Sequence, residues 1–217
     1  MRRLLPVLVV AAASVSALPA AADEEDDEAI AEAALPTLDD IPAGWEESPS
    51  DEDTSRTGLA ECKAIDRVSK TAEKQPNAES PNFVDPADST GITQIESRVF
   101  VFSSTKGAKK YFKAWEPEAA EDCLIALGLA VAEQEVPDAE VAVETLGVEG
   151  IGDDVVGRSL ILDDPDDESG ENSVYTDIFV ARVGRAIVGL STQATGSSLP
   201  EGLDLLELIV GRVEEGL

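Results

Sequence analysis

In a sequence of 217 residues with 45 aspartates and glutamates and no histidine, carboxylates are the side chains most able to do chemistry. Without an imidazole, neither a Ser-His-Asp triad nor a histidine metal site can form. Two carboxylates suffice to hydrolyse a glycosidic bond. Among so many acids some pair always lies close, so proximity alone indicates little. We therefore expect a protein that is not an enzyme and has no catalytic residues.

The densest acidic run, DDPDDESGEN at 163–172, offers the oxygen ligands that calcium prefers. An EF-hand loop needs glycine at position 6 and glutamate at position 12. Counting from Asp164, Gly170 falls at position 7 and Tyr175 at position 12. We interpret the run as a solvated hairpin loop, with weak calcium binding outside that motif as the alternative. GVEGIGDD at 147–154 lacks the helix and lysine of a phosphate loop. No metal site and no cofactor is expected.

The two cysteines, Cys62 and Cys123, are predicted to form one disulfide. An even pair in an oxidising compartment is most simply a bridge. It would close a loop of about 60 residues and stabilise the fold by about 4 kcal/mol. A redox or metal role is the alternative, but zinc or copper would need unusual carboxylate ligands in a chain without histidine.

A basic cluster is formed by Lys106, Lys109, Lys110 and Lys113. Such spacing is typical of any exposed helix face, so we interpret it as solvated. Contact with an anionic polymer or a lipid headgroup is the alternative.

The charge of the chain is strongly negative and unevenly distributed. The formal net charge is −29. Residues 23–55 carry 14 acids and no base, residues 56–113 carry 10 bases and 7 acids, and residues 114–217 carry 4 bases and 24 acids. Nucleic acid is excluded as a partner, because phosphate binding needs lysine and arginine. The basic middle segment is expected to neutralise the acidic remainder in part, with a polarised face for an anionic cell-surface partner as the alternative.

The N-terminus predicts export. Arg2 and Arg3 precede an apolar run, and Ala20-Ala21-Ala22 provides small residues for cleavage, so residues 1–22 are interpreted as a signal peptide. No cysteine at the cleavage point offers a lipid anchor, and no later apolar run approaches the roughly 20 residues of a membrane span. Residues 23–34 are predicted to be a flexible acidic leader, and residues 35–217 a single domain. We expect a secreted monomer without stable membrane insertion.

Apolar periodicity predicts four helices that position these residues, at about 58–74, 105–115, 117–128 and 200–213. Ser104 or Thr105 caps the second, Gly128 ends the third and Ser198 caps the fourth. Their inward stripes are Leu59, Cys62, Ile65, Val68 and Ala72; Ala108, Tyr111, Phe112 and Trp115; Ala120, Cys123, Leu124 and Leu127; and Leu203, Leu206, Val210 and Val213.

The strands are predicted from β-branched composition and alternation. One lies at 93–104, with Ile95, Val99 and Val101 on one face and Phe100 and Phe102 on the other. Four more, at 139–147, 154–162, 173–183 and 185–194, form an antiparallel meander. The fold class is therefore α+β, an antiparallel sheet of about five strands with helices packed on one face and a single disulfide.

Two segments lie outside these elements. NAESPNFVDPADSTG at 77–91 is predicted to be a long polar loop, which is either mobile or functional. Trp45 follows the turn Pro42-Ala43-Gly44 and is interpreted as an anchor for the entry segment, with ligand stacking as the alternative.

The chain resembles a known group of proteins over residues 35–217. The resemblance is carried by LPTLDDIPAGW, ECKAI, VFVFSS, AKKYFKAW, EDCLIALG and the ending VARVGRAIVGLSTQATGSSLPEGLDLLELIVGRV. In these features the chain resembles exported actinobacterial proteins of the PknH-like extracellular sensor domain and small envelope lipoprotein group. The resemblance implies an α+β module with disulfides that brace helices around a cleft for an envelope ligand. This chain departs from it in having no kinase domain, no lipidated cysteine and one cysteine pair where two are common.

Together these features predict a secreted, non-enzymatic binding or accessory module of the cell envelope with an unidentified ligand. Its cleft is expected between the sheet and the helices near residues 75–92. An alternative is a protein-interaction partner or inhibitor of an exported enzyme, which would expose an apolar patch. A second alternative is a carboxylate-based hydrolase, which would need two carboxylates about 5–9 Å apart in a deep cleft. No ligand-binding residue is identified.

Overall fold

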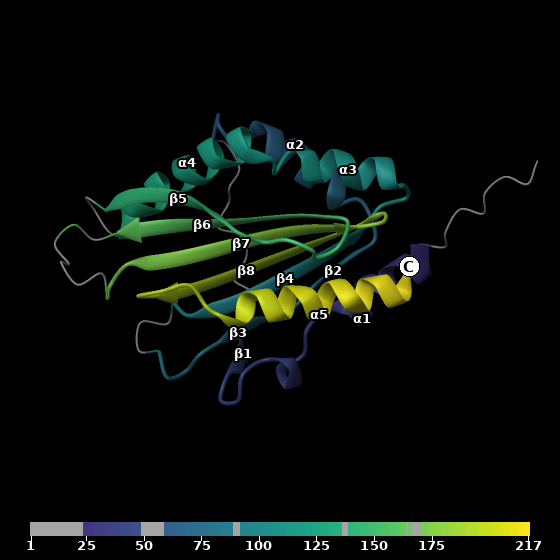
Figure 1. Ribbon diagram of the computed structural model, residues 1–217, viewed down its shortest axis with the longest axis horizontal. Coiled ribbons are helices and arrows are strands. Elements are labelled where there is room, and N and C mark those ends of the chain that lie inside the picture. The colour runs from purple at the N-terminus through teal and green to yellow at the C-terminus, as the bar shows by residue number, and fades with distance from the viewer. Residues whose placement is uncertain (1–23, 49–58, 89–91, 136–138, 164, 166–170) are drawn as a thin grey trace, which may run out of the picture.

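A computed structural model describes residues 24–48, 59–88, 92–135, 139–163, 165 and 171–217. The predicted signal peptide at 1–22, and Asp23 after it, lie outside these residues. Within them, a single antiparallel sheet of eight strands is covered by helices on both faces (Figure 1).

The sheet has the strand order β1-β3-β4-β8-β7-β6-β5, and β2 pairs with β4 beside β3. The predicted meander and the predicted strand at 93–104 are confirmed as β4 to β8. The three additional strands, β1 to β3, have three residues each and pair with β4 or with one another, so they are too short to show a periodicity of their own. The strands are β1 Glu46–Ser48, β2 Asn77–Glu79, β3 Asn82–Val84, β4 Gln94–Val101, β5 Glu140–Leu146, β6 Asp154–Asp163, β7 Val174–Val183 and β8 Ala186–Thr195.

The expected count of about five strands is therefore too low, and the predicted loop at 77–91 is wrong where β2 and β3 form. Both strands pair with β4, which supplies long-range hydrogen-bond partners that local sequence does not reveal.

The helices form two layers. α2 (Lys63–Ala72), α3 (Thr105–Lys113) and α4 (Pro117–Glu135) cover one face of the sheet, and α1 (Glu24–Ala34) and α5 (Glu201–Gly216) cover the other (Figure 1). A short 3-10 helix spans Leu38–Asp40. The prediction of helices on one face is wrong, because the central strands are apolar on both sides and each side must be covered.

β4 shows this two-sided burial clearly. Val99 and Val101 belong to the core beneath α1 and α5, whereas Phe100 belongs to the core beneath α2 and α3, as predicted. Phe102, directly after the strand, joins the second core. Trp45 is half-buried against the first core, which agrees with the anchor interpretation.

Residues 24–34 are not the predicted flexible leader but the helix α1. Alanine and glutamate favour the helix, and acids in its first turn suit the helix dipole. Ala31 and Ala34 are fully buried, and Asp27 pairs with Arg185 across 158 positions. The charge of this segment suggested disorder because its counter-ion lies so far along the chain.

Three helix boundaries differ from the prediction. α2 begins at Lys63, after turns at 59–62. α4 runs past Gly128 to Glu135. In α5, Leu203 is exposed, and Ser198 donates a hydrogen bond to Asp177 instead of capping the helix. The predicted cap of α3 is confirmed, because the Ser104 hydroxyl accepts a hydrogen bond from the Gly107 N–H.

The predicted disulfide is present between Cys62, immediately before α2, and Cys123 in α4. Both residues are buried in the core beneath this helical layer. The bridge therefore ties two helices of one layer together. Among the helices that the structure describes, none has the length and apolar character to span a bilayer.

Candidate functional site

A groove of about 550 Å³ lies on the sheet face that carries α2 and α3. Its floor is formed by β4, β7 and β8, with β2 at one side, and its wall is formed by α2 together with Tyr111 and Trp115. Two residues of the 75–92 segment, Asn77 and Glu79, line it. The expected cleft between sheet and helices therefore has a counterpart in the structure, although its position depends mainly on α2.

Gly189 leaves the floor of the groove open. It lies in β8 between Val188 and Leu190, whose side chains belong to the opposite core, so a side chain at 189 would point toward the groove. A Cβ atom there would have only the Arg98 carbonyl oxygen, at 3.8 Å, within 4 Å. The absence of a side chain thus contributes directly to the hollow.

Aromatic rings form the apolar part of the groove. The rings of Phe100 and Tyr111 lie 5.8 Å apart between centroids. Trp115 is only 6% exposed, and its indole Nε1–H finds no acceptor among the residues that the structure describes. A buried donor without a partner costs about 1–3 kcal/mol, and such groups in native proteins call for an explanation.

The polar groups of the groove carry charges of both signs. Asp66, Lys70 and Glu73 line it from successive turns of α2. On the floor, the Arg98 guanidinium pairs with Glu79 and stands over the Phe100 ring, 5.9 Å from its centroid. This mixture, with aromatic rings beside hydrogen-bonding groups, is typical of sites for small polar ligands.

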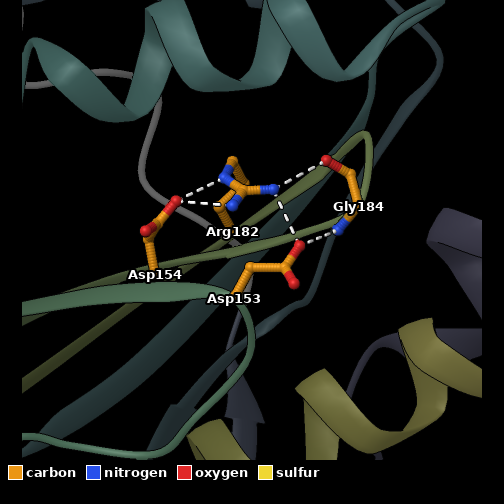
Figure 2. Close-up of polar contacts among 4 residues, drawn as sticks. All are labelled: Asp153, Asp154, Arg182 and Gly184. Atoms are coloured by element: carbon orange, nitrogen blue, oxygen red, sulfur yellow. Dashed lines mark hydrogen bonds and ion pairs between the residues drawn. The ribbon is translucent and has the colours of Figure 1, made fainter.

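A second cluster of charges braces the turn between β7 and β8 (Figure 2). Arg182, with a side chain only 7% exposed, donates hydrogen bonds to Asp154 from Nε at 2.6 Å and to Asp153 from Nη1 at 2.7 Å. The Gly184 N–H donates to the same Asp153 oxygen at 2.7 Å. This N–H and the arginine lower the pKa of Asp153, against the effect of partial burial. These hydrogen bonds from Arg182 and Gly184 hold the turn.

Gly152 explains the glycine-rich sequence before these acids. Its φ is +65°, and a Cβ atom there would lie 2.7 Å from the Arg182 carbonyl oxygen. Only glycine fits this position, which brings Asp153 and Asp154 onto the arginine. Gly150 and Gly152 are turn formers between two predicted strands, and the turn is present, but the pairing of Asp153 and Asp154 with Arg182 could not be read from this segment alone.

Two further arginines hold the N-terminal elements. Arg185 forms two hydrogen bonds with Asp27 of α1, at 2.6 and 2.5 Å, and this partner raises the pKa of the arginine. Arg212 of α5 is bidentate with Asp40, at 3.0 and 2.8 Å. Arg158, in contrast, is 5% exposed, has no ion pair among the described residues and leaves Nε without a partner.

Neither the described part of the acidic run nor the lysine face of α3 forms a metal-binding cluster. Of the run at 163–172, the structure describes only Asp163, Pro165, Glu171 and Asn172, and Asp163 accepts a hydrogen bond from Ser173. The part of the chain that is described contains no group of three potential metal ligands. The four lysines of α3 are exposed, as expected for a solvated face.

The chain is similar to a solved structure but matches no known sequence family. Comparison with protein families finds no match, and comparison with curated proteins finds no significant relative. The crystal structure of the extracellular domain of PknH from Mycobacterium tuberculosis superposes with a TM-score of 0.54 and 10% sequence identity. The match covers 89% of this chain and 97% of that domain. At this identity the likeness establishes a shared fold, and the resemblance noted in the sequence is supported at that level.

Proposed function

We propose that this chain is a non-enzymatic extracellular binding module, and that it holds a ligand of the cell envelope in the groove between α2 and the sheet. The observation that carries the proposal is the groove itself, whose floor is left open by Gly189 and whose lining combines the aromatic residues Tyr111 and Trp115 with charged groups. The fold of an extracellular sensor domain supports the same kind of function.

A secreted location agrees with the signal peptide predicted at residues 1–22 and with the Cys62–Cys123 bridge, since disulfides persist in oxidising compartments. The lack of histidine supports a non-enzymatic role, because the commonest general acid-base group is missing. We propose that the module acts as a monomer.

The substitution Gly189→Val tests the groove with little disturbance of the fold. Valine is favoured in strands, and the space above Gly189 is empty, so we expect an unchanged Tm without ligand. Gly147→Val is the matched control, because Gly147 also has open space around it but lies outside the groove lining.

Short-chain phospholipids, oligosaccharides and peptides from the envelope should be screened by thermal shift, and hits measured by calorimetry on the three proteins. We expect at least one class to raise the Tm, with Kd at least tenfold weaker for Gly189→Val and unchanged for Gly147→Val. Absence of any stabilising class, or equal affinity of both variants, would overturn the proposal.

A second candidate, a protein-interaction partner, is supported by α4. This helix exposes Leu129 by 51% and Val131 by 44%. It packs beside β5, which among the described strands pairs only with β6 and so ends the sheet. Binding through this surface would be insensitive to Gly189→Val, so the same experiment distinguishes the two functions.

A further inference from the structure

A second, smaller cavity lies on the other flank of α2. It has a volume of about 170 Å³ and lies between α2 and α3. Its lining includes Val68, Thr71, Phe102, Gly107, Lys110 and Tyr111, and only Tyr111 is shared with the groove. The cavity is therefore a separate site, and a ligand bound there would be independent of the proposed function of the groove.

Glycine at position 107 allows α3 to approach the Phe102 ring closely at one wall of this cavity. A Cβ atom at Gly107 would lie 3.0 Å from Cδ1 of the Phe102 ring, a contact closer than most side chains tolerate. The first turn of α3 thus approaches the ring with little side-chain material between them. Val68 and the Phe102 and Tyr111 rings make most of the remaining wall apolar.

The mouth of the cavity is positively charged. Lys110 is the one charged residue in its lining. Lys106 and Lys113 lie one turn away from Lys110 on α3, and Arg67 and Lys74 lie one turn away from Thr71 on the α2 side. All five bases are exposed, and none forms an ion pair within the described part of the chain.

The two flanks of α2 consequently differ in charge. The flank toward the groove carries Asp66 and Glu73 beside Lys70, whereas the flank toward the cavity carries bases only. In a protein of net charge −29, five bases around one apolar hollow attract an anion to that place.

We infer that the α2–α3 cavity binds a small amphiphilic carboxylate, with an apolar group of about phenyl size inside and its carboxylate at the mouth against Lys110. The volume is comparable to that of an apolar cavity of about 150 Å³ known to bind benzene. Lysine provides a mobile point charge that can follow a carboxylate at the mouth.

Phenylacetate is the probe. Two matched controls accompany it: 2-phenylacetamide, which lacks the charge, and acetate, which lacks the ring. Binding to the full chain is followed by chemical-shift titration of the Gly107 amide. We expect phenylacetate to bind at least fivefold more tightly than either control. Lys110→Gln should raise the Kd of phenylacetate at least fivefold. Lys63→Gln removes the same charge from an exposed residue at the start of α2 that does not line the cavity, and it should leave this Kd unchanged.

Equal affinities for phenylacetate and phenylacetamide would overturn the inference, and so would equal effects of the two lysine variants. Binding of acetate as tight as that of phenylacetate would show simple attraction of anions to a basic surface, which also contradicts it. If phenylacetate bound in the groove instead of the cavity, Gly189→Val would abolish the chemical-shift changes, so this variant distinguishes the two sites.

Discussion

At the scale of single residues, the ion pair between Asp40 and Arg212 shows how one of the few basic side chains stabilises the fold. Both of its carboxylate oxygens accept hydrogen bonds from Arg212, and one also accepts from the Thr37 N–H at 2.8 Å. The hydrogen bond from Arg212 is the main reason that the pKa of Asp40 lies below its usual value of 3.8, and partial burial opposes it. Arg212 also donates to the Leu35 carbonyl at 3.0 Å, so one arginine fixes the whole connection after α1.

The lowered pKa of Asp40 predicts a stability change in acid. A carboxyl whose folded-state pKa is lowered contributes fully above the unfolded-state value, and this contribution is lost as pH falls from about 4 toward the folded-state pKa. Asp40→Asn should therefore reduce the free energy of unfolding by about 1–2 kcal/mol at pH 7, because the ion pair is partly buried. The difference from the unmodified chain should shrink by pH 3.

Urea unfolding at pH 7 and pH 3 measures both effects. Asp39→Asn is the control, because Asp39 is exposed and forms no ion pair with a described base. If the two asparagine variants lose the same stability, or if the loss for Asp40→Asn is the same at both pH values, the role given to this ion pair is wrong.

At the scale of elements, long regular patterns were predictable and short or paired ones were not. β4 to β8 have seven to ten residues each, so their alternation is visible in the sequence. The short strands β2 and β3 pair with β4, and β1 pairs with β3, so these three strands depend on partners outside their own sequence. α1 requires Arg185 and the surface of α5, which lie more than 150 positions away in sequence.

The candidate sites were less predictable than the fold. The disulfide followed from the count and placement of two cysteines. The groove could not be predicted from the sequence, because Gly189 of β8 and Trp115 line it together. No local sequence pattern indicates that these two residues lie close in the fold. Gly128 gave a misleading signal. Glycine often ends a helix, but here it allows α4 to approach β5 and β6.

The close approach of α4 to the sheet predicts an exception to helix propensity. Alanine at an exposed helical glycine normally stabilises a protein by up to about 1 kcal/mol. A Cβ atom at Gly128 would lie 2.6 Å from Cγ1 of Val141 and 2.9 Å from Cδ1 of Leu160, so overpacking should outweigh that gain. We expect Gly128→Ala to lower the free energy of unfolding by about 1 kcal/mol.

Gly211→Ala is the matched control in α5, since a Cβ atom there has no neighbour within 4 Å. It should raise stability in the same urea titration. Stabilisation by both alanines would show that α4 does not press against the sheet at Gly128.

At the scale of the whole molecule, exposed bases concentrate on α2 and α3. Exposed acids lie on α4, which covers the same face of the sheet, and on α1 and α5, which cover the other face (Figure 1). Three of the four arginines after residue 113 are used in ion pairs, two of them with the acidic N-terminal elements. The neutralisation that we expected from the basic middle segment therefore comes, among the ion pairs of the described residues, from these arginines instead. The exposed bases of α2 and α3 remain available on the face with the groove and the cavity.

The two tryptophans report on the two faces independently. Trp115 lines the groove, and Trp45 packs against the core on the opposite side of the sheet. With two indole N–H signals in the whole chain, each can be followed directly by NMR. Trp45 therefore serves as an internal control for any general effect of a ligand.

The most direct test of groove binding is the indole N–H spectrum during titration with an envelope ligand that stabilises the protein. We predict that the Trp115 signal shifts in proportion to occupancy while the Trp45 signal stays in place, and that Gly189→Val removes the shift. A stabilising ligand that moves Trp45 and leaves Trp115 unchanged would contradict the assignment of the groove as the binding site.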